Sequence, residues 1–283
     1  MIKLCAFADE ASAELAGQIR ALRRNAIPYL ELRGVNGKNV RELTACEAKE
    51  IAATLRESGI GVLSVGSPIG KIALDGDLEG HFDEFKRILE TAEILGASRI
   101  RLFSFFPVRG MSPERTEALV LENMARLLSL TPEGITLCHE NEKDIFGERT
   151  DACLLLHETF PRLRAVFDPA NFVQCGVDTW DAWQRLRPYV DYLHIKDAVA
   201  DGTVVPAGMG IGHVPAIVGD YLARGGEIMT LEPHLQEFTG LSALENGASA
   251  RLGMTAYRDN DASFDAAAAA LKDILRDGGY GSW

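Results

Sequence analysis

Short apolar segments alternate with amphipathic segments from one end of the chain to the other. Eight short segments have the length and the β-branched or apolar content of strands, at residues 3–8, 27–33, 60–67, 98–105, 134–140, 164–169, 190–197 and 227–233. Helical spacing follows each one; after the first, Leu15, Ile19 and Leu22 share a face. Eight alternating strand and helix units in 283 residues predict an α/β fold, a single (β/α)8 TIM barrel.

A doubly wound sheet is the alternative arrangement of the same units. Such a sheet usually has a glycine-rich turn after its first strand, and the segment AFADEAS contains no glycine. No linker or change of composition divides the chain, so we expect one barrel domain over residues 1–283. The long segment 234–261 precedes the last helix, and connections of this length are usually functional or part of an interface. We expect it beside the barrel mouth, where it could cover a neighbouring subunit of a homo-oligomer.

The composition excludes several kinds of partner. Asp and Glu number 41 against 29 Lys and Arg, a net charge of −12 that disfavours binding to nucleic acid. No segment approaches the ~20 apolar residues of a membrane span, and the first residues lack the apolar stretch of a signal peptide. The five cysteines form no CxxC pair, and Cys5, Cys138 and Cys153 lie in apolar runs, which predicts buried free thiols. We therefore expect a cytoplasmic protein without nucleic-acid or membrane partners.

Residues of the metal-ligand type stand at the ends of the last four predicted strands. Glu140, Asp168, His194 and Glu232 are separated by 28, 26 and 38 residues, about one strand–helix unit each. Active sites of such barrels form where the strands end, and consecutive units are neighbours in space. We therefore expect these four side chains to converge.

The alternation of side chains along a strand supports this expectation. Residues two apart share a face, so Thr136, Cys138 and Glu140 point one way while Leu137 and His139 point the other. The strands at 190–197 and 227–233 show the same division, with large aliphatic residues opposite the ligand-type residue. The segment at 164–169 is too short for the alternation of its side chains to be tested. The pattern predicts that the ligand-type side chains point into the barrel.

Three carboxylates and one imidazole form a hard, oxygen-rich set of ligands. Such a set favours one divalent ion, Mn²⁺ or Mg²⁺, with Co²⁺ or Zn²⁺ as alternatives. An ion with open positions would polarise a substrate carbonyl and stabilise an enediolate. Each residue alone also suits an ordinary role; Asp168 before Pro169 could begin a turn, and His194 could be a core histidine. Their equivalent positions in four units favour the metal site.

Several motifs connect these residues to a known family. They are CHENEKDIFG, FDPANF, LHIKD and TLEPHL, and in the first half of the chain FADE, LELRGVNGKNV, SVGSPIGK and RLFSF. With them, essentially the whole sequence resembles the xylose isomerase-like TIM-barrel family of sugar isomerases and epimerases. The resemblance implies that Glu140, Asp168, His194 and Glu232 bind one divalent metal. It also implies that Glu140 and Glu232 act as catalytic acid and base in exchanging a proton beside a carbonyl.

The sequence departs from parts of this family. The 3-epimerases carry a substrate-binding histidine where this chain has Asn171, and an arginine where it has Ala200, which weakens the expectation of a free ketohexose substrate. The DNA-repair endonucleases of the superfamily need a histidine-rich trinuclear zinc site, which six histidines and an acidic charge disfavour. The resemblance thus implies a metal-dependent isomerase or epimerase of a small sugar derivative. A keto-polyol dehydratase using the same site and a non-catalytic metal- or sugar-binding barrel are the alternatives.

Some further residues are candidates for contact with a carbohydrate substrate. Lys196 shares the face of His194, Lys71 follows the third strand, and Asn171 follows Asp168. Glu31 and Arg33 share an inward parity that suits a salt bridge or a substrate contact, and Glu142 is an alternative acid or base. The glycines Gly208, Gly210 and Gly212 could form an adaptable loop at the mouth, although their spacing is no phosphate fingerprint.

Overall fold

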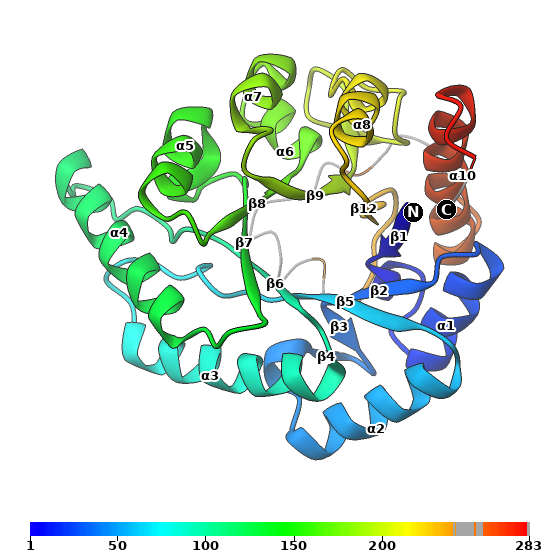
Figure 1. The fold of residues 1–283 in the computed structure, drawn as a ribbon, viewed down its shortest axis with the longest axis horizontal. Helices are drawn as coiled ribbons and strands as arrows, with labels where there is room; N and C mark the ends of the chain where they lie inside the picture. The colour runs from blue at the N-terminus through cyan, green and yellow to red at the C-terminus, as the bar shows by residue number, and fades with distance from the viewer. Residues whose placement is uncertain (240, 242–251, 253–256, 282–283) are drawn as a thin grey trace.

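The computed structural model shows eight parallel strands closed into a barrel, in the order β1-β12-β9-β8-β7-β6-β5-β2 (Figure 1). It describes residues 1–239, 241, 252 and 257–281. The strands are β1 (Lys3–Ala6), β2 (Tyr29–Leu32), β5 (Gly61–Gly66), β6 (Arg99–Leu102), β7 (Thr136–Glu140), β8 (Arg164–Phe167), β9 (Val190–Ile195) and β12 (Ile228–Leu231). Each lies inside one of the eight predicted segments. The predicted TIM barrel is confirmed, and the doubly wound alternative is wrong.

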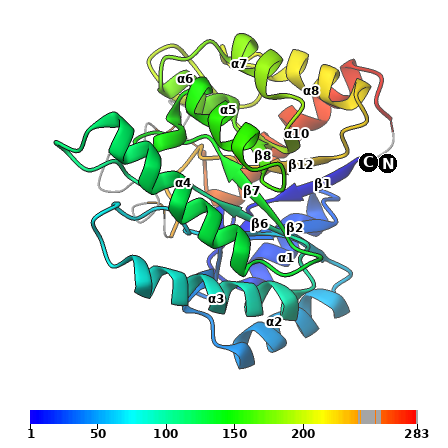
Figure 2. The same cartoon turned by 60° about the vertical axis from the view of Figure 1, so that its left-hand side comes forward.

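Helices form a ring around the barrel. They are α1 (Leu15–Arg24), α2 (Ala45–Glu57), α3 (Leu78–Leu95), α4 (Pro113–Leu130), α5 (Thr150–Thr159), α6 (Pro169–Gln174), α7 (Thr179–Leu186), α8 (Val214–Ala223) and α10 (Asn260–Asp277). Figure 2 shows α2, α3 and α4 side by side on one flank. Side-chain caps start several of them: the Thr44 side chain accepts from the backbone of Glu47, and Ser112 caps α4 just before Pro113.

Short elements sit in the loops that follow the strands. These are three 3-10 turns, η1 (Ala8–Glu10), η2 (Val40–Glu42) and η3 (Phe146–Glu148), and two hairpins, β3 (Gly34–Val35) with β4 (Lys38–Asn39) and β10 (Asp197–Ala198) with β11 (Val204–Val205). They shape the mouth of the barrel at the carboxyl ends of the strands. Most of segment 234–261, expected beside this mouth, lies outside the described residues.

The barrel divides its apolar residues between two regions. Leu137 and Leu193 point outward into the large core between strands and helices. Cys138, Val166 and Tyr192 belong instead to a small buried cluster of inward-facing residues. The strands therefore show the predicted alternation of side chains. Leu137 and Leu193 point outward to the helices, and the inward-facing residues fill the barrel interior below its mouth.

A carboxylate lies buried inside the barrel below the mouth. Glu31 is fully buried and accepts hydrogen bonds from Tyr192 (2.9 Å), Ser64 (3.2 Å) and Thr230 (2.8 Å). Hydroxyl donors from three other strands thus satisfy a charge that would otherwise be costly to bury. This polar layer fixes the interior directly beneath His194, whose ring Nε2 lies 3.4 Å from Glu31 Oε2.

Two other expectations can be compared with the fold. All five cysteines are free, and Cys5, Cys138 and Cys153 are buried as predicted, whereas Cys46 is exposed and Cys175 is partly exposed. Among the described residues, no helix has the length and apolar character needed to cross a membrane.

Candidate metal centre

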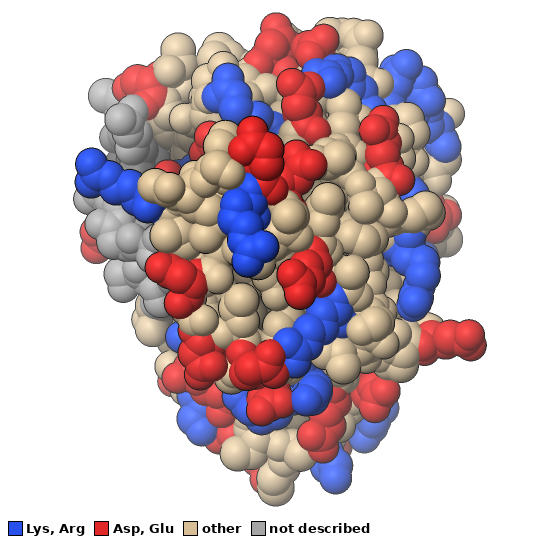
Figure 3. Space-filling view, turned by 90° about the vertical axis from the view of Figure 1, so that its left-hand side faces the viewer, with Lys and Arg blue, Asp and Glu red and all other residues tan. Residues whose placement is uncertain are grey.

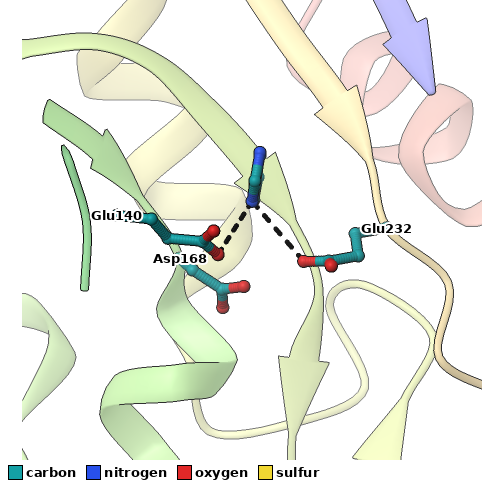
Figure 4. Close-up of side chains that lie close together, drawn as sticks. Glu140, Asp168 and Glu232 are labelled. Atoms are coloured by element: carbon teal, nitrogen blue, oxygen red, sulfur yellow. Dashed lines mark hydrogen bonds and ion pairs between the residues drawn. The ribbon is translucent and has the colours of Figure 1, made fainter. Parts of the chain in front are cut away.

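The structure brings together the four side chains that the sequence places at strand ends. Glu140, Asp168, His194 and Glu232 are all buried, and one ligand atom from each lies within 4.8 Å of the others. Figure 4 shows the three carboxylates pointing toward a shared space at the mouth of the barrel. The strands β7, β8, β9 and β12 that position them are consecutive in the sheet. Their expected role as metal ligands stays a prediction.

Glu140 is the last residue of β7 and is held through both carboxylate oxygens. Its Oε1 lies 2.9 Å from His194 Nδ1 and accepts a hydrogen bond from the Asn171 side chain at 3.3 Å. Its Oε2 lies 3.2 Å from Nε of Arg101. A cation on one side and polar donors on the other leave this carboxylate little rotational freedom, so its position is set before any ligand arrives.

Asp168 occupies a different place from the one predicted. The segment 164–169 was expected to be strand throughout, but β8 ends at Phe167 and Asp168 caps α6, where Oδ1 accepts from the backbone N–H of Asn171 at 2.9 Å. The strand stops here because Pro169 cannot donate to a ladder and suits the first turn of a helix. Oδ2 remains directed at the site and lies 2.9 Å from Lys196 Nζ. Burial raises the pKa of Asp168 to about 7 despite that lysine.

His194 stands at the centre of the carboxylates. Its Nδ1 lies 2.9 Å from Glu140 and 3.5 Å from Glu232, while Nε2 faces Glu31. Burial alone would lower the pKa of His194, but Glu140 and Glu31 raise it well above its usual value. The field at Nδ1 therefore favours a positive charge, whether a proton on the ring or a metal ion bound to it. A carboxylate behind the far nitrogen is the usual support of a metal-binding histidine.

Glu232 follows β12 and is surrounded by cations. Its Oε2 accepts a hydrogen bond from Lys196 at 3.0 Å, and its Oε1 accepts one from Arg33 at 3.0 Å. Burial alone would raise the pKa of Glu232, but Lys196, His234 and His194 hold it well below its usual range. Glu232 is therefore ionised at neutral pH.

The structure contradicts one of the two roles expected for Glu31 and Arg33, and the other, contact with a substrate, stays a prediction. No salt bridge joins them, because Glu31 points into the barrel and Arg33 turns to Asp9, Glu10 and Glu232, at 2.9, 3.0 and 3.0 Å. Asp9 and Glu10 were missed as parts of the site, although they stand in the FADE segment directly after the first strand. Burial raises the pKa of Glu10 to about 8, although Arg33 opposes this effect.

Arg101 was also missed. It lies inside β6, fully surrounded, with Nη1 donating to the carbonyl of Ser67 at 3.1 Å and Nε facing Glu140. The strand alternates Arg99 and Arg101 with Ile100 and Leu102, and a charged residue at an inward-facing position was the signal that could have identified it. Asn141 is a further missed residue; it exchanges two hydrogen bonds with the backbone of Asp168 at 2.9 and 3.0 Å.

The predicted substrate-contact residues all line the pocket above the carboxylates. Lys196 is buried between Asp168 and Glu232, Asn171 is buried against Glu140, and Lys71 bonds to Glu142 at 3.1 Å and lies 4.4 Å above the ring of Phe103. Contact with a substrate stays a prediction for each of them.

Two further sequence expectations concern residues around the site. His139 turns away from the centre, as expected, and its Nε2 lies 3.0 Å from Ser104 Oγ. The glycine loop is not free to adapt, because the backbone N–H groups of Gly208, Gly210 and Gly212 all donate to the buried carboxylate of Asp197 at 2.9 to 3.0 Å. Its amide groups are used within the chain.

The donor set suits a divalent cation. Three buried carboxylates and an imidazole nitrogen face one another, and Asp168 Oδ2 accepts no hydrogen bond of normal geometry within the described part of the chain, although Lys196 lies beside it. Buried negative charge without full compensation is costly, so a cation at this point would stabilise the folded protein. Glu140, Asp168, His194 and Glu232 would hold it.

Solved structures with the same fold extend over nearly the whole chain. The probable 3-DHS dehydratase AsbF involved in petrobactin synthesis from Bacillus anthracis is 16% identical, with a TM-score of 0.71 over 96% of this chain and 99% of that one. The IolI protein with a bound zinc atom is 15% identical, with a TM-score of 0.72 over 100% of both chains. D-psicose 3-epimerase from Clostridium cellulolyticum H10, solved with D-tagatose, is 13% identical, with a TM-score of 0.74 over 97% and 99%. At these identities the likeness shows the fold.

The sequence itself identifies the family. No curated protein matches the chain significantly. The profile of one protein family, described as xylose isomerase-like TIM barrel, matches residues 19–247. That span includes all four candidate ligands and most of the barrel. The chain therefore belongs to the xylose isomerase-like TIM-barrel family.

Proposed function

We propose that the protein is a divalent-metal-dependent isomerase or epimerase that moves a proton next to the carbonyl of a small sugar or keto-sugar derivative. The observation that supports this most directly is the convergence of Glu140, Asp168, His194 and Glu232 within 4.8 Å at the mouth of the barrel. The structural similarity to D-psicose 3-epimerase and L-ribulose 3-epimerase is consistent with it.

The four ligand residues would hold one metal ion. The three carboxylate oxygens favour Mn²⁺ or Mg²⁺, and the imidazole also suits Co²⁺ or Zn²⁺. When bound, the ion supplies a Lewis acid that polarises a carbonyl.

Glu140 and Glu232 are the proposed acid and base. They project from β7 and from the residue after β12, which are separated by β8 and β9, so their carboxylates approach the shared space from two directions. One carboxylate takes the proton from the carbon beside the carbonyl, and the electron pair moves to the carbonyl oxygen. Return of a proton to the opposite face by the other glutamate, which enters this step as the carboxylic acid and leaves it as the carboxylate, inverts that carbon. Return to the neighbouring carbon would isomerise the sugar instead.

Lys196 and Asn171 are the proposed contacts for substrate oxygens. The neighbouring carboxylates raise the pKa of Lys196 well above its usual value, against the effect of burial, so the ammonium keeps its proton. A protonated donor beside two carboxylates can hydrogen-bond an oxygen that gains negative charge. This ammonium also favours a dehydratase as the second candidate, because it could protonate a departing hydroxyl after the same proton abstraction.

Exchange of substrate protons with D₂O tests the proposal. A panel of ketoses and keto-polyols is incubated in D₂O with the protein, with Mn²⁺ or with EDTA, and analysed by mass and NMR. Metal-dependent deuterium uptake without loss of water indicates an isomerase or epimerase, and loss of water indicates the dehydratase. Binding without exchange or loss of water in any compound would leave only a non-catalytic binding barrel.

Location and assembly are separate proposals. We infer a cytoplasmic location from the five free thiols, which persist in reducing compartments. We also propose a homo-oligomer, on the length of segment 234–261. A monomer in light scattering would exclude the oligomer.

A further inference from the structure

Two pockets adjoin at the mouth of the barrel. The inner pocket, above the four ligand residues, has a volume of ≈ 30 Å³, which is room for one or two waters. The outer pocket has a volume of ≈ 350 Å³, within the range of small-molecule sites. Arg33, Lys71, Arg101 and Phe103 line both, so the two pockets lie side by side. A sugar is too large for the inner pocket alone, and the outer pocket is the adjoining space that could hold the rest of a substrate reacting beside Glu140 and Glu232.

The outer pocket reverses the charge balance of the chain. Acidic residues outnumber basic ones by 41 to 29 in the sequence, yet among the described residues five cationic side chains and two carboxylates, Asp9 and Glu42, line this pocket. The cations are Arg33, Lys38, Arg41, Lys71 and Arg101. The inner pocket has the same bias, with five cations and three carboxylates.

One neighbouring hollow and one outer face of the molecule lack this bias among their described residues. A neighbouring hollow is lined by Asp9, Glu237, Asp259 and Asp261 with no lysine or arginine among its described residues. On the outer face in Figure 3, Lys and Arg lie intermixed with Asp and Glu. The two pockets beside the ligand residues therefore differ in charge from this hollow and from the face in Figure 3.

The cations differ in how firmly their partners hold them. Arg33 is buried and paired with three carboxylates, so these partners fix its position in the site. Arg41 is half exposed, and its Nη1 lies 3.9 Å from Glu84, a long contact. Lys38 is also half exposed and pairs with Glu47 on α2. Exposed pairs of this kind contribute little to stability, so these two side chains can turn to a ligand at small cost.

We infer that the substrate carries an anionic group, a carboxylate or a phosphate, that binds Arg41 and Lys38 in the outer pocket while its carbonyl end reaches Glu140 and Glu232. This inference rests on the proposed function and names its substrate class. A neutral sugar would desolvate these cations without compensating their charge, whereas an anion forms charge-assisted hydrogen bonds with them. A positive pocket on an acidic protein also guides an anionic ligand toward it.

Equilibrium binding tests the inference. Isothermal titration calorimetry compares a neutral ketose, the keto-aldonate of the same chain length and the corresponding ketose phosphate, on metal-free and on Mn²⁺-loaded protein. We expect at least one anion to bind about tenfold or more tightly than the neutral ketose, the effect of a charge-assisted hydrogen bond. The preference should fall as NaCl is raised. Comparison of the two anions separates a carboxylate from a phosphate.

Matched variants locate the anion. Arg41→Gln and Lys38→Met should each reduce the preference about fivefold or more, with Tm near that of the wild type. Lys86→Met removes an exposed cation that pairs with Asp83 on α3, and should leave the preference unchanged. Equal affinity for the neutral ketose, or equal effects of the three substitutions, would overturn the inference.

The outcome is distinguishable from that of the proposed function. Anion-selective binding that depends on Arg41 without any deuterium exchange would refute the isomerase and leave the inference standing. Exchange with a neutral ketose at the same kcat/KM as with its anionic counterparts would support the isomerase and refute the inference.

Discussion

Replacement of Arg33 by methionine should destabilise the fold strongly. Arg33 is 3% exposed, and its guanidinium pairs with Asp9, Glu10 and Glu232 at 2.9 to 3.0 Å. Methionine keeps the apolar packing over Phe7, whose ring centre lies 4.2 Å from the guanidinium carbon, and removes only the charge and its donors. Removing one partner of a buried pair leaves uncompensated charge and costs about 3–5 kcal/mol. That is a large share of the ~5–15 kcal/mol by which domains are stable.

A surface arginine gives the matched control. Arg24 also binds two carboxylates, Asp261 and Asp265, but its side chain is 40% exposed. Exposed pairs contribute about 0–1 kcal/mol, so Arg24→Met should change the free energy of unfolding by no more than that. Both variants have the same change in charge and in side-chain type. The difference between them therefore measures the effect of burial.

Urea denaturation at pH 7 measures the change for each variant. A fall in the midpoint at constant slope reports lost stability rather than a changed unfolded state. The double variant Arg33→Met with Asp9→Asn should lose less than the sum of the single losses, because the second change removes a charge that the first left unpaired. If Arg33→Met and Arg24→Met cost the same, the buried ion pairs around Arg33 are not stabilising and the reasoning fails.

Three other predictions concern the site. Glu140→Gln and Glu232→Gln should each lower deuterium exchange by at least about 10²-fold, because an amide cannot accept the substrate proton, while far-ultraviolet circular dichroism stays unchanged. Addition of EDTA should lower Tm, and Mn²⁺ at 100 times its Kd should restore about 2.7 kcal/mol of stability; no shift with any divalent ion would contradict the metal site. In metal-free protein, Glu10 keeps its proton up to pH about 8 when folded but loses it near its usual pKa when unfolded. Stability should therefore fall as pH rises between those values, by up to about 1.4 kcal/mol per unit. Glu10→Gln should reduce that slope in urea titrations, and an unchanged slope would contradict the prediction.

The sequence was sufficient for the barrel and for the meeting of the four ligand residues, because both follow from local regularities. Alternation along β7 places Glu140 inward, and the spacing of one unit puts Asp168, His194 and Glu232 at or directly after the ends of consecutive strands. Closure of a parallel barrel then brings strand ends to one mouth whatever the detailed packing.

The partners of long side chains did not follow from the same regularities. Arg33 and Glu232 are 199 residues apart and meet only because β1 closes the barrel between β2 and β12. An arginine at a strand end can reach many acceptors, and the choice of Asp9 and Glu10 over Glu31 depends on how the η1 turn leaves β1. Asp168 caps a helix through one oxygen and is a candidate ligand through the other. These two roles could not be predicted either, because they depend on the residue at which β8 ends.

The two proposed acid–base residues have the same kind of environment. In each, an arginine faces one carboxylate oxygen and the other oxygen is turned to the centre: Arg101 faces Oε2 of Glu140, and Arg33 donates to Oε1 of Glu232. His194 Nδ1 lies near both remaining oxygens, at 2.9 and 3.5 Å. The arginines therefore orient one oxygen of each glutamate toward the shared space. Because they come from β6 and from the end of β2, strands that carry none of the ligands, the geometry of the site depends on both halves of the barrel.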